Sequence, residues 1–94
     1  MVPRLLAAGH EVQSLDSMFF EDCIFGESMP ELKGSPKDIR DVTEADLKGF
    51  DAIIHLAALS NDPLSNLDPR LTYEINHEAT IRLAKIAREV GVNR

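Results

Sequence analysis

The sequence predicts an α/β fold built on a doubly wound parallel sheet. Three observations lead to this prediction. Residues 52–56 form an almost unbroken apolar run, which is typical of an inner strand covered on both faces by helices. Residues 69–90 carry apolar side chains at helical spacing. Helical and strand patterns alternate along the chain, as they do in right-handed βαβ units.

The first predicted helix lies close to the amino end. Residues 5–8 are good helix formers, and Gly9 followed by His10 is a typical helix stop. Pro3 is tolerated only in a first turn, so either the helix begins there or residues that normally precede it are absent. A short strand is then predicted up to Asp16. A carboxylate in this place is where a dinucleotide fold holds a ribose, although a single Asp is also common in turns.

The middle of the chain is predicted to be mostly loop. Residues 17–35 show no clear period and predict a long covering loop with a short helical turn. Residues 37–41 form a brief strand end or turn. Thr43 has the character of an N-cap, with acidic residues in the turn that follows, so a short helix is predicted through Leu47 and a stop at Gly49.

A long amphipathic helix is the clearest single prediction. Asp68 can cap its first amides, Pro69 suits the first helical position, and Gly91 is placed to end it. The residues after this glycine lead toward a further strand. One apolar face is predicted, made of Leu71, Ile75, Ala79, Leu83, Ile86, Ala87 and Val90.

Small residues follow the predicted inner strand. Ala57 and Ala58 would let a ligand lie close to the main chain past the carboxyl end of the strand, which is where ligands bind in open parallel sheets. They would equally let a helix pack closely, and on spacing alone both interpretations stay open.

Composition bounds the class of protein. A chain of 94 residues is enough for one small domain, and no internal repeat indicates a second one. The net charge of −6 argues against a nucleic-acid partner, and no apolar run approaches the length of a membrane span. Cys23 is the only cysteine, which excludes an intramolecular disulfide and fits a cytoplasmic protein. The histidines have no metal-ligand spacing, so no metal is expected.

Several short motifs, taken in order, resemble a known family. The chain is similar to the amino-terminal part of an extended short-chain dehydrogenase/reductase, in the NAD-dependent epimerase/dehydratase branch that acts on nucleotide sugars. The resemblance implies that residues 1–94 are a partial NAD-binding Rossmann domain, a fragment that lacks the first strand with its Gly-rich loop and everything after the long helix. The motifs are Leu5-Leu6 with Gly9-His10-Glu11-Val12, Leu15-Asp16, Asp38-Ile39-Arg40-Asp41, His55-Leu56-Ala57-Ala58, and Asn76 with Arg82-Leu83-Ala84.

The resemblance implies NAD as the cofactor and assigns an adenosine-binding group. Asp16 would accept hydrogen bonds from the ribose hydroxyls, and its charge would repel the 2′-phosphate of NADP. Ser17 and Met18 would flank this carboxylate. Asp38 would accept from the adenine amino group, and Ile39 would border the ring.

A second implied group would follow the rest of the cofactor. The first three residues of this group would pass the ribose and diphosphate, and the fourth and fifth would turn toward the nicotinamide. The sixth, an asparagine, would fix the backbone geometry near the site. In that order they are Leu56, Ala57, Ala58, Leu59, Ser60 and Asn76.

Two motifs of the family are missing, and they bear on catalysis. The chain contains no Gly-x-x-Gly-x-x-Gly, the diphosphate cradle, and no Tyr-x-x-x-Lys, which holds the family's acid/base. We therefore assign no catalytic residue and expect residues 1–94 to be inactive by themselves.

Two classes of function remain. The first is a nucleotide-sugar epimerase, dehydratase or decarboxylase, which is an isomerase, lyase or oxidoreductase. Such an enzyme works by transient hydride transfer between the sugar and NAD. The resemblance is compatible with a homodimer. The second is a non-catalytic dinucleotide-binding sensor or scaffold of the same fold. A Tyr-x-x-x-Lys motif beyond Arg94 would decide for the enzyme. The particular sugar does not follow from these residues.

Overall fold

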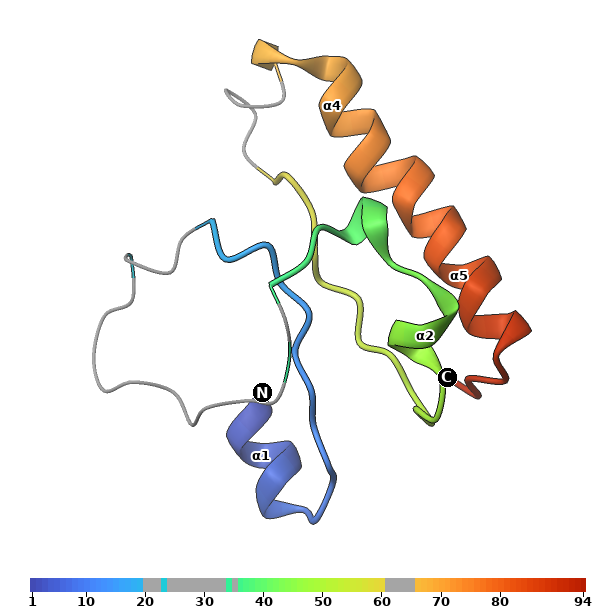
Figure 1. Cartoon of the computed structure of the whole chain (residues 1–94). Helices are drawn as coiled ribbons and strands as arrows, with labels where there is room; N and C mark the ends of the chain where they lie inside the picture. The colour runs from blue at the N-terminus through green and yellow to red at the C-terminus, as the bar shows by residue number, and fades with distance from the viewer. Residues whose placement is uncertain (20–22, 24–33, 35, 61–65) are drawn as a thin grey trace. The chain divides into compact units, whose positions relative to one another are not determined.

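The computed structural model describes residues 1–19, 23, 34, 36–60 and 66–94 (Figure 1). Most of the predicted loop 17–35, and the part of the chain just after Ser60, lie outside the described residues. The chain divides into two compact units, Met1–Asp38 and Ile39–Arg94, and each is considered by itself.

The first unit opens with helix α1, Val2–Ala7, which has its proline in the first turn as predicted. The predicted stop is confirmed. Gly9 adopts the left-handed conformation with φ +86°, which glycine accepts without steric cost. Its amide donates to the carbonyl of Leu6, and the amide of His10 donates to that of Leu5. These two bonds form the Schellman arrangement that satisfies the last carbonyls of a helix.

The segment ending at Asp16 has a parallel partner in the same unit. Asp16 and Pro36 form an isolated parallel bridge, and the amide of Lys37 donates to the carbonyl of Asp16 over 2.9 Å. The two backbones approach so closely that a Cβ at Gly34 would overlap the carbonyl oxygen of Ser14. The predicted short strand therefore pairs, in the parallel sense, with the segment that leads to Asp38.

The second unit is built around the predicted long helix, which runs without a break through three elements: α4, Pro69–Tyr73; the π-helical turn η3, Glu74–Glu78; and α5, Ala79–Glu89. Asp68 Oδ1 accepts from the amide of Leu71 at 2.9 Å, which confirms the predicted cap. Gly91, with φ +85°, follows the carboxyl end. The π-helical turn was not predicted.

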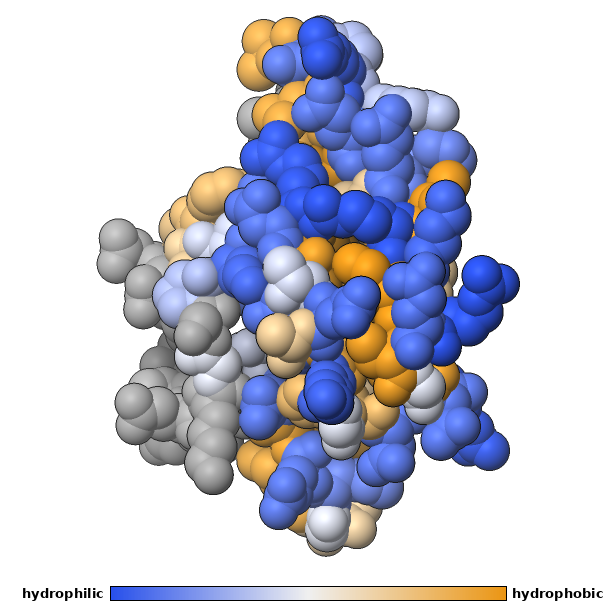
Figure 2. Space-filling view, turned by 45° about the vertical axis from the view of Figure 1, so that its right-hand side comes forward, coloured by the Kyte–Doolittle hydropathy of each residue, from blue (hydrophilic) through white to orange (hydrophobic). Residues whose placement is uncertain are grey.

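Two short elements pack against this helix. The 3-10 turn η2 spans Ile39–Asp41, and α2 spans Glu44–Leu47 (Figure 1). The Asp46 carboxylate accepts from both the amide and the hydroxyl of Thr43, each at 2.7 Å, so the predicted helix start is confirmed. Among the described residues, the buried hydrophobic ones all lie in this unit: Ile39, Val42, Leu47, Ile75, Ala79 and Leu83. Elsewhere the long helix turns mainly polar side chains outward (Figure 2).

Residues 55–59 run along the helix in the opposite direction, because His55 contacts Thr80 whereas Leu59 contacts Asn76, which lies earlier in the helix. Before them, residues 51–53 pair with the residues that follow the helix. The carbonyl of Asp51 accepts from the amide of Arg94 at 3.3 Å, and the amide of Ile53 donates to the carbonyl of Arg94 at 2.8 Å. A residue whose two backbone groups bond to residues two apart is paired in the parallel sense. The end of the described chain thus begins a parallel partner for the segment 51–53.

The predicted inner strand at 52–56 is not formed as a strand among the described residues. Ile54 is 55% exposed and Leu56 is 73% exposed, whereas an inner strand would bury both. An inner strand needs hydrogen-bonded neighbours on both edges and helices on both faces. The described residues supply it with one short pairing and one helix. Within them, the predicted doubly wound sheet is represented by two parallel pairings.

The uneven core gives a first testable expectation. None of the described residues of Met1–Asp38 is buried, while the described part of Ile39–Arg94 holds six buried hydrophobic side chains. Because burial of apolar surface drives cooperative folding, residues 1–94 produced alone should unfold in urea over a broad range. Circular dichroism during a urea titration measures this. One sharp transition, with the slope of a two-state domain of this length, would contradict it.

Candidate functional site

Asp16 sits at the end of its paired segment with an exposed carboxylate. Its Oδ1 accepts from the amide of Met18 at 2.8 Å, which forms a tight turn that orients the side chain. Met18 has φ +59°, a left-handed conformation that a side chain of this size seldom adopts. One carboxylate oxygen is thus engaged by the chain.

The two acidic residues of the predicted adenosine group lie at the ends of neighbouring segments. Asp38 is half-buried and comes two residues after Pro36, the bridge partner of Asp16. Ser17 is half-buried as well. The first unit therefore brings its predicted site residues to one edge of the parallel pair.

Ile39 is placed differently from what a ring contact would require. Its side chain is only 8% exposed, and its carbonyl accepts from Arg82 Nη2 at 3.4 Å. The side chain thus belongs to the core of the second unit. Its position at the adenine ring stays a prediction.

Asn76 holds the segment after the apolar run by both of its amide atoms. Asn76 Oδ1 accepts from the amide of Leu59 at 2.8 Å, and Asn76 Nδ2 donates to the carbonyl of Leu59 at 2.9 Å. Both backbone groups of one residue are therefore satisfied by one side chain. Asn76 lies in the π-helical turn η3, and such turns occur frequently at functional sites.

A second anchor was missed from the sequence. His55 Nε2 lies 2.9 Å from Thr80 Oγ1, and Thr80 Oγ1 donates to the carbonyl of Asn76, also at 2.9 Å. The available signal was the spacing of Asn76 and Thr80, since residues four apart lie on the same face of a helix. It did not indicate which residue of the facing segment would meet them.

The stretch between the two anchors is exposed. Leu56, Ala57 and Ala58 are all open to solvent, while His55 and Leu59 on either side are half-buried and hydrogen-bonded to the helix. Ser60 is exposed too. Small side chains on a segment tied at both ends leave the main chain accessible to a ligand that must come close.

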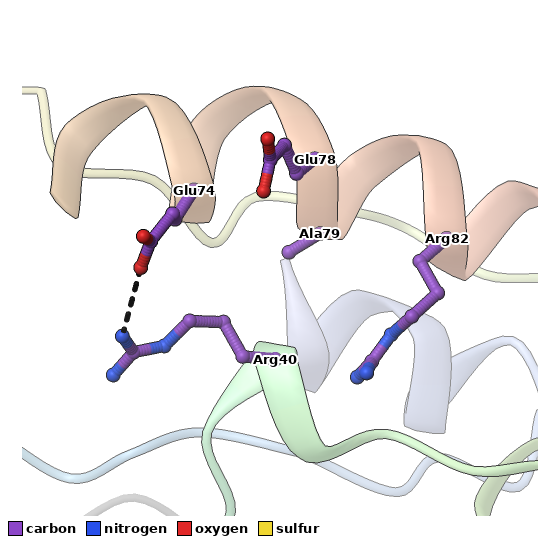
Figure 3. Close-up of a pocket in the computed structure, with 5 residues that line it drawn as sticks. All are labelled: Arg40, Glu74, Glu78, Ala79 and Arg82. Atoms are coloured by element: carbon purple, nitrogen blue, oxygen red, sulfur yellow. Dashed lines mark ion pairs between the residues drawn. The ribbon is translucent and has the colours of Figure 1, made fainter. Parts of the chain in front are cut away.

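A surface hollow of about 200 Å³ lies between η2 and the helix, lined by Arg40, Glu74, Glu78, Ala79 and Arg82 (Figure 3). Arg40 Nη1 and Glu74 Oε2 form an ion pair at 3.8 Å. Arg82 also donates to the carbonyl of Val42 at 3.3 Å. Charges of both signs therefore face one another here, and the ion pair connects η2 to the helix. Because carboxylates line the hollow together with the arginines, it is not suited to an anionic ligand.

The described part of the chain shows neither a metal site nor a membrane-spanning helix. No group of three or more His, Cys, Asp or Glu side chains there is placed to hold a metal ion. Within the same ranges, no helix combines the length and apolar character needed to cross a membrane.

Parallel-paired segments that alternate with helices are features of an α/β protein. The model of the NAD dependent epimerase/dehydratase family matches residues 1–94, and the chain belongs to this family. The fold class is therefore the Rossmann-type α/β fold, and the family's cofactor is a nicotinamide dinucleotide.

The UDP-glucose 4-epimerase of Mycolicibacterium smegmatis is one protein to which the chain is similar. The two sequences are 34% identical over 103 residues, which cover 100% of this chain and 32% of the relative. The chain thus spans about a third of the length of this relative. No solved structure matches the chain.

Proposed function

We propose that this chain supplies part of the NAD site of an enzyme that modifies a nucleotide sugar, by epimerisation, dehydration or decarboxylation. Membership of the family and the likeness to a UDP-glucose 4-epimerase support the class of reaction. The observation that carries the proposal is the attachment of Leu59 to Asn76, because it fixes an exposed small-residue segment directly after a parallel-paired segment.

The acidic pair suits the adenosine end of the cofactor. A ribose presents hydroxyl donors and adenine presents an amino donor, and carboxylates are acceptors for both. Asp16, with one oxygen held by the Met18 amide, would accept from the ribose hydroxyls. Asp38 would accept from the adenine amino group. Ser17 and Met18 would flank the Asp16 carboxylate, and the backbone of Ile39 would lie near the ring.

The anchored segment suits the middle of the cofactor. Leu56, Ala57 and Ala58 would lie along the ribose and diphosphate, since they are exposed and two of them have only a methyl side chain. Leu59 and Ser60 would turn toward the nicotinamide. Bound NAD supplies the hydride acceptor, and these residues hold and orient it. No residue of this chain is proposed as the acid or base of the reaction.

Removing the Asn76 side chain tests the proposal. In the whole protein, Asn76→Ala should raise the Kd for NAD about tenfold, because two hydrogen bonds that hold Leu59 are lost at about 1 kcal/mol each and part of this cost appears in binding. Asn76→Asp keeps an acceptor for the Leu59 amide but has no donor for the Leu59 carbonyl. Its Kd for NAD should therefore lie between that of the wild type and that of Asn76→Ala. Calorimetric titration of NAD measures all three.

Asn93 offers a matched control, since it is an exposed asparagine in the same unit. Asn93→Ala should bind NAD as the wild type does. Unchanged NAD affinity in Asn76→Ala, with its helical circular dichroism intact, would remove residues 56–60 from the cofactor site.

A further inference from the structure

The hydroxyl of Thr80 lies between the carbonyl of Asn76 and the ring of His55. The direction of its hydrogen bonds determines which ring nitrogen of His55 carries the proton. Thr80 Oγ1 is 2.9 Å from the carbonyl oxygen of Asn76 and 2.9 Å from Nε2 of His55. A hydroxyl has one hydrogen to donate, and a carbonyl oxygen can only accept. The hydrogen of Thr80 is therefore directed to Asn76. The Thr80 oxygen is left as an acceptor toward His55.

We infer that Thr80 fixes the His55 ring with its proton on Nε2, and that His55 is thereby a positioning residue for the segment Leu56–Ser60. With the proton on Nδ1 instead, Nε2 would present a lone pair to the Thr80 oxygen. Thr80 would then have to turn its hydrogen toward His55 and release the Asn76 carbonyl. One hydrogen bond of the pair would be lost in that arrangement, so the Nε2-protonated ring is preferred.

The inferred role in positioning follows from where the anchors lie. His55 and Leu59 flank the exposed residues 56–58, and both are held by one turn of the helix, through Thr80 and Asn76. Thr80 also bonds to the backbone of Asn76, so the two anchors are joined to each other. Loosening the histidine should therefore loosen the attachment of Leu59. Only the step from this segment to the binding of NAD rests on the function proposed above.

The position of the proton can be measured directly. In the whole protein labelled with ¹⁵N-histidine, long-range ¹H–¹⁵N correlation spectra distinguish the two neutral forms of the ring. We expect His55 to carry its proton on Nε2 in the wild type. Thr80→Val should give a mixture of both forms, while Thr80→Ser, which keeps the hydroxyl, should preserve the wild-type form.

Thr72 is a control built into the same helix. Its Oγ1 donates to the carbonyl of Asp68 at 3.1 Å, the same spacing of four residues, but with no histidine as a second partner. Thr72→Val removes an equivalent back-bond and should leave His55 unchanged. Exchange of the Leu59 amide hydrogen gives a second readout, and it should be about fivefold faster in Thr80→Val than in either Thr72→Val or the wild type.

The outcomes separate this inference from the proposed function. A wild-type ring whose only proton is on Nδ1 overturns the inference, whether or not Thr80→Val folds. An unchanged ring form and unchanged Leu59 exchange in a folded Thr80→Val protein also overturn it. If both readouts change as expected and the wild type fails to bind NAD, the inference is supported and the proposed function is wrong.

Discussion

Ala58→Phe in the whole protein is expected to weaken NAD binding about 100-fold, because a large side chain placed where a ligand must approach the backbone costs up to about 3 kcal/mol. The segment cannot simply move aside. Ala58 is exposed, but the residue after it is held by Asn76 through two hydrogen bonds, and His55 is held by Thr80. The introduced ring should therefore occupy the place of the cofactor and should not displace the chain.

The fold should survive this change, since the side chain of Ala58 has solvent around it. Helical circular dichroism is expected to match that of the wild type. Ala45→Phe is the control, because Ala45 is an exposed alanine in α2 of the same unit. Titration of NAD by calorimetry compares the three proteins. Normal NAD affinity in Ala58→Phe would remove Ala58 from the cofactor site.

Helix ends were predictable from the sequence because their chemistry is local. Gly9 and Gly91 adopt the left-handed conformation that was expected of helix stops, and Asp68 caps the amide three residues ahead. The Thr43 and Asp46 pair forms as its spacing indicates. Each of these depends only on residues within one or two turns of one another, so the sequence contains all the partners.

The site was less predictable because its contacts join distant residues. Asn76 was expected near the site from the family resemblance, but its bonds to Leu59 could not follow from spacing. The π-helical turn around it was not indicated by the apolar spacing, which predicts only a helix. The bond of His55 to Thr80 spans 25 positions, and a histidine within an apolar run gives no sign of its partner.

The predicted sheet is only partly reproduced in the described part of the chain, for a different reason. The apolar run 52–56 predicted an inner strand, yet among the described residues no strand forms there, and Ile54 and Leu56 are exposed. A pattern reports the surroundings for which a sequence is suited. Whether those surroundings are present depends on the other segments that pair with the run and cover it. The parallel pairings at Asp16 and at Asp51 are consistent with the family's fold, and they involve few residues.

NAD is expected to bind the whole protein more tightly than NADP. The substitution Asp16→Ala should reduce the difference between the two affinities. A carboxylate that accepts from ribose hydroxyls contributes about 1.5–3 kcal/mol, so its loss should weaken NAD binding about tenfold to 100-fold. The same charge repels a 2′-phosphate, so NADP should bind Asp16→Ala at least as well as it binds the wild type. Parallel titrations of both cofactors measure the change.

Asp16→Asn separates the charge from the turn that it supports. An asparagine keeps the oxygen that accepts from the Met18 amide, a bond of 2.8 Å in the wild type, but it carries no charge. If the charge sets the preference, Asp16→Asn should discriminate against NADP as poorly as Asp16→Ala does, while its turn stays formed. If the turn sets the preference, Asp16→Asn should behave as the wild type. Glu11→Ala, which removes an exposed carboxylate from the same unit, should change neither affinity. Equal affinities of the wild type for NAD and NADP would remove Asp16 from the ribose site, because its charge would then meet no 2′-phosphate.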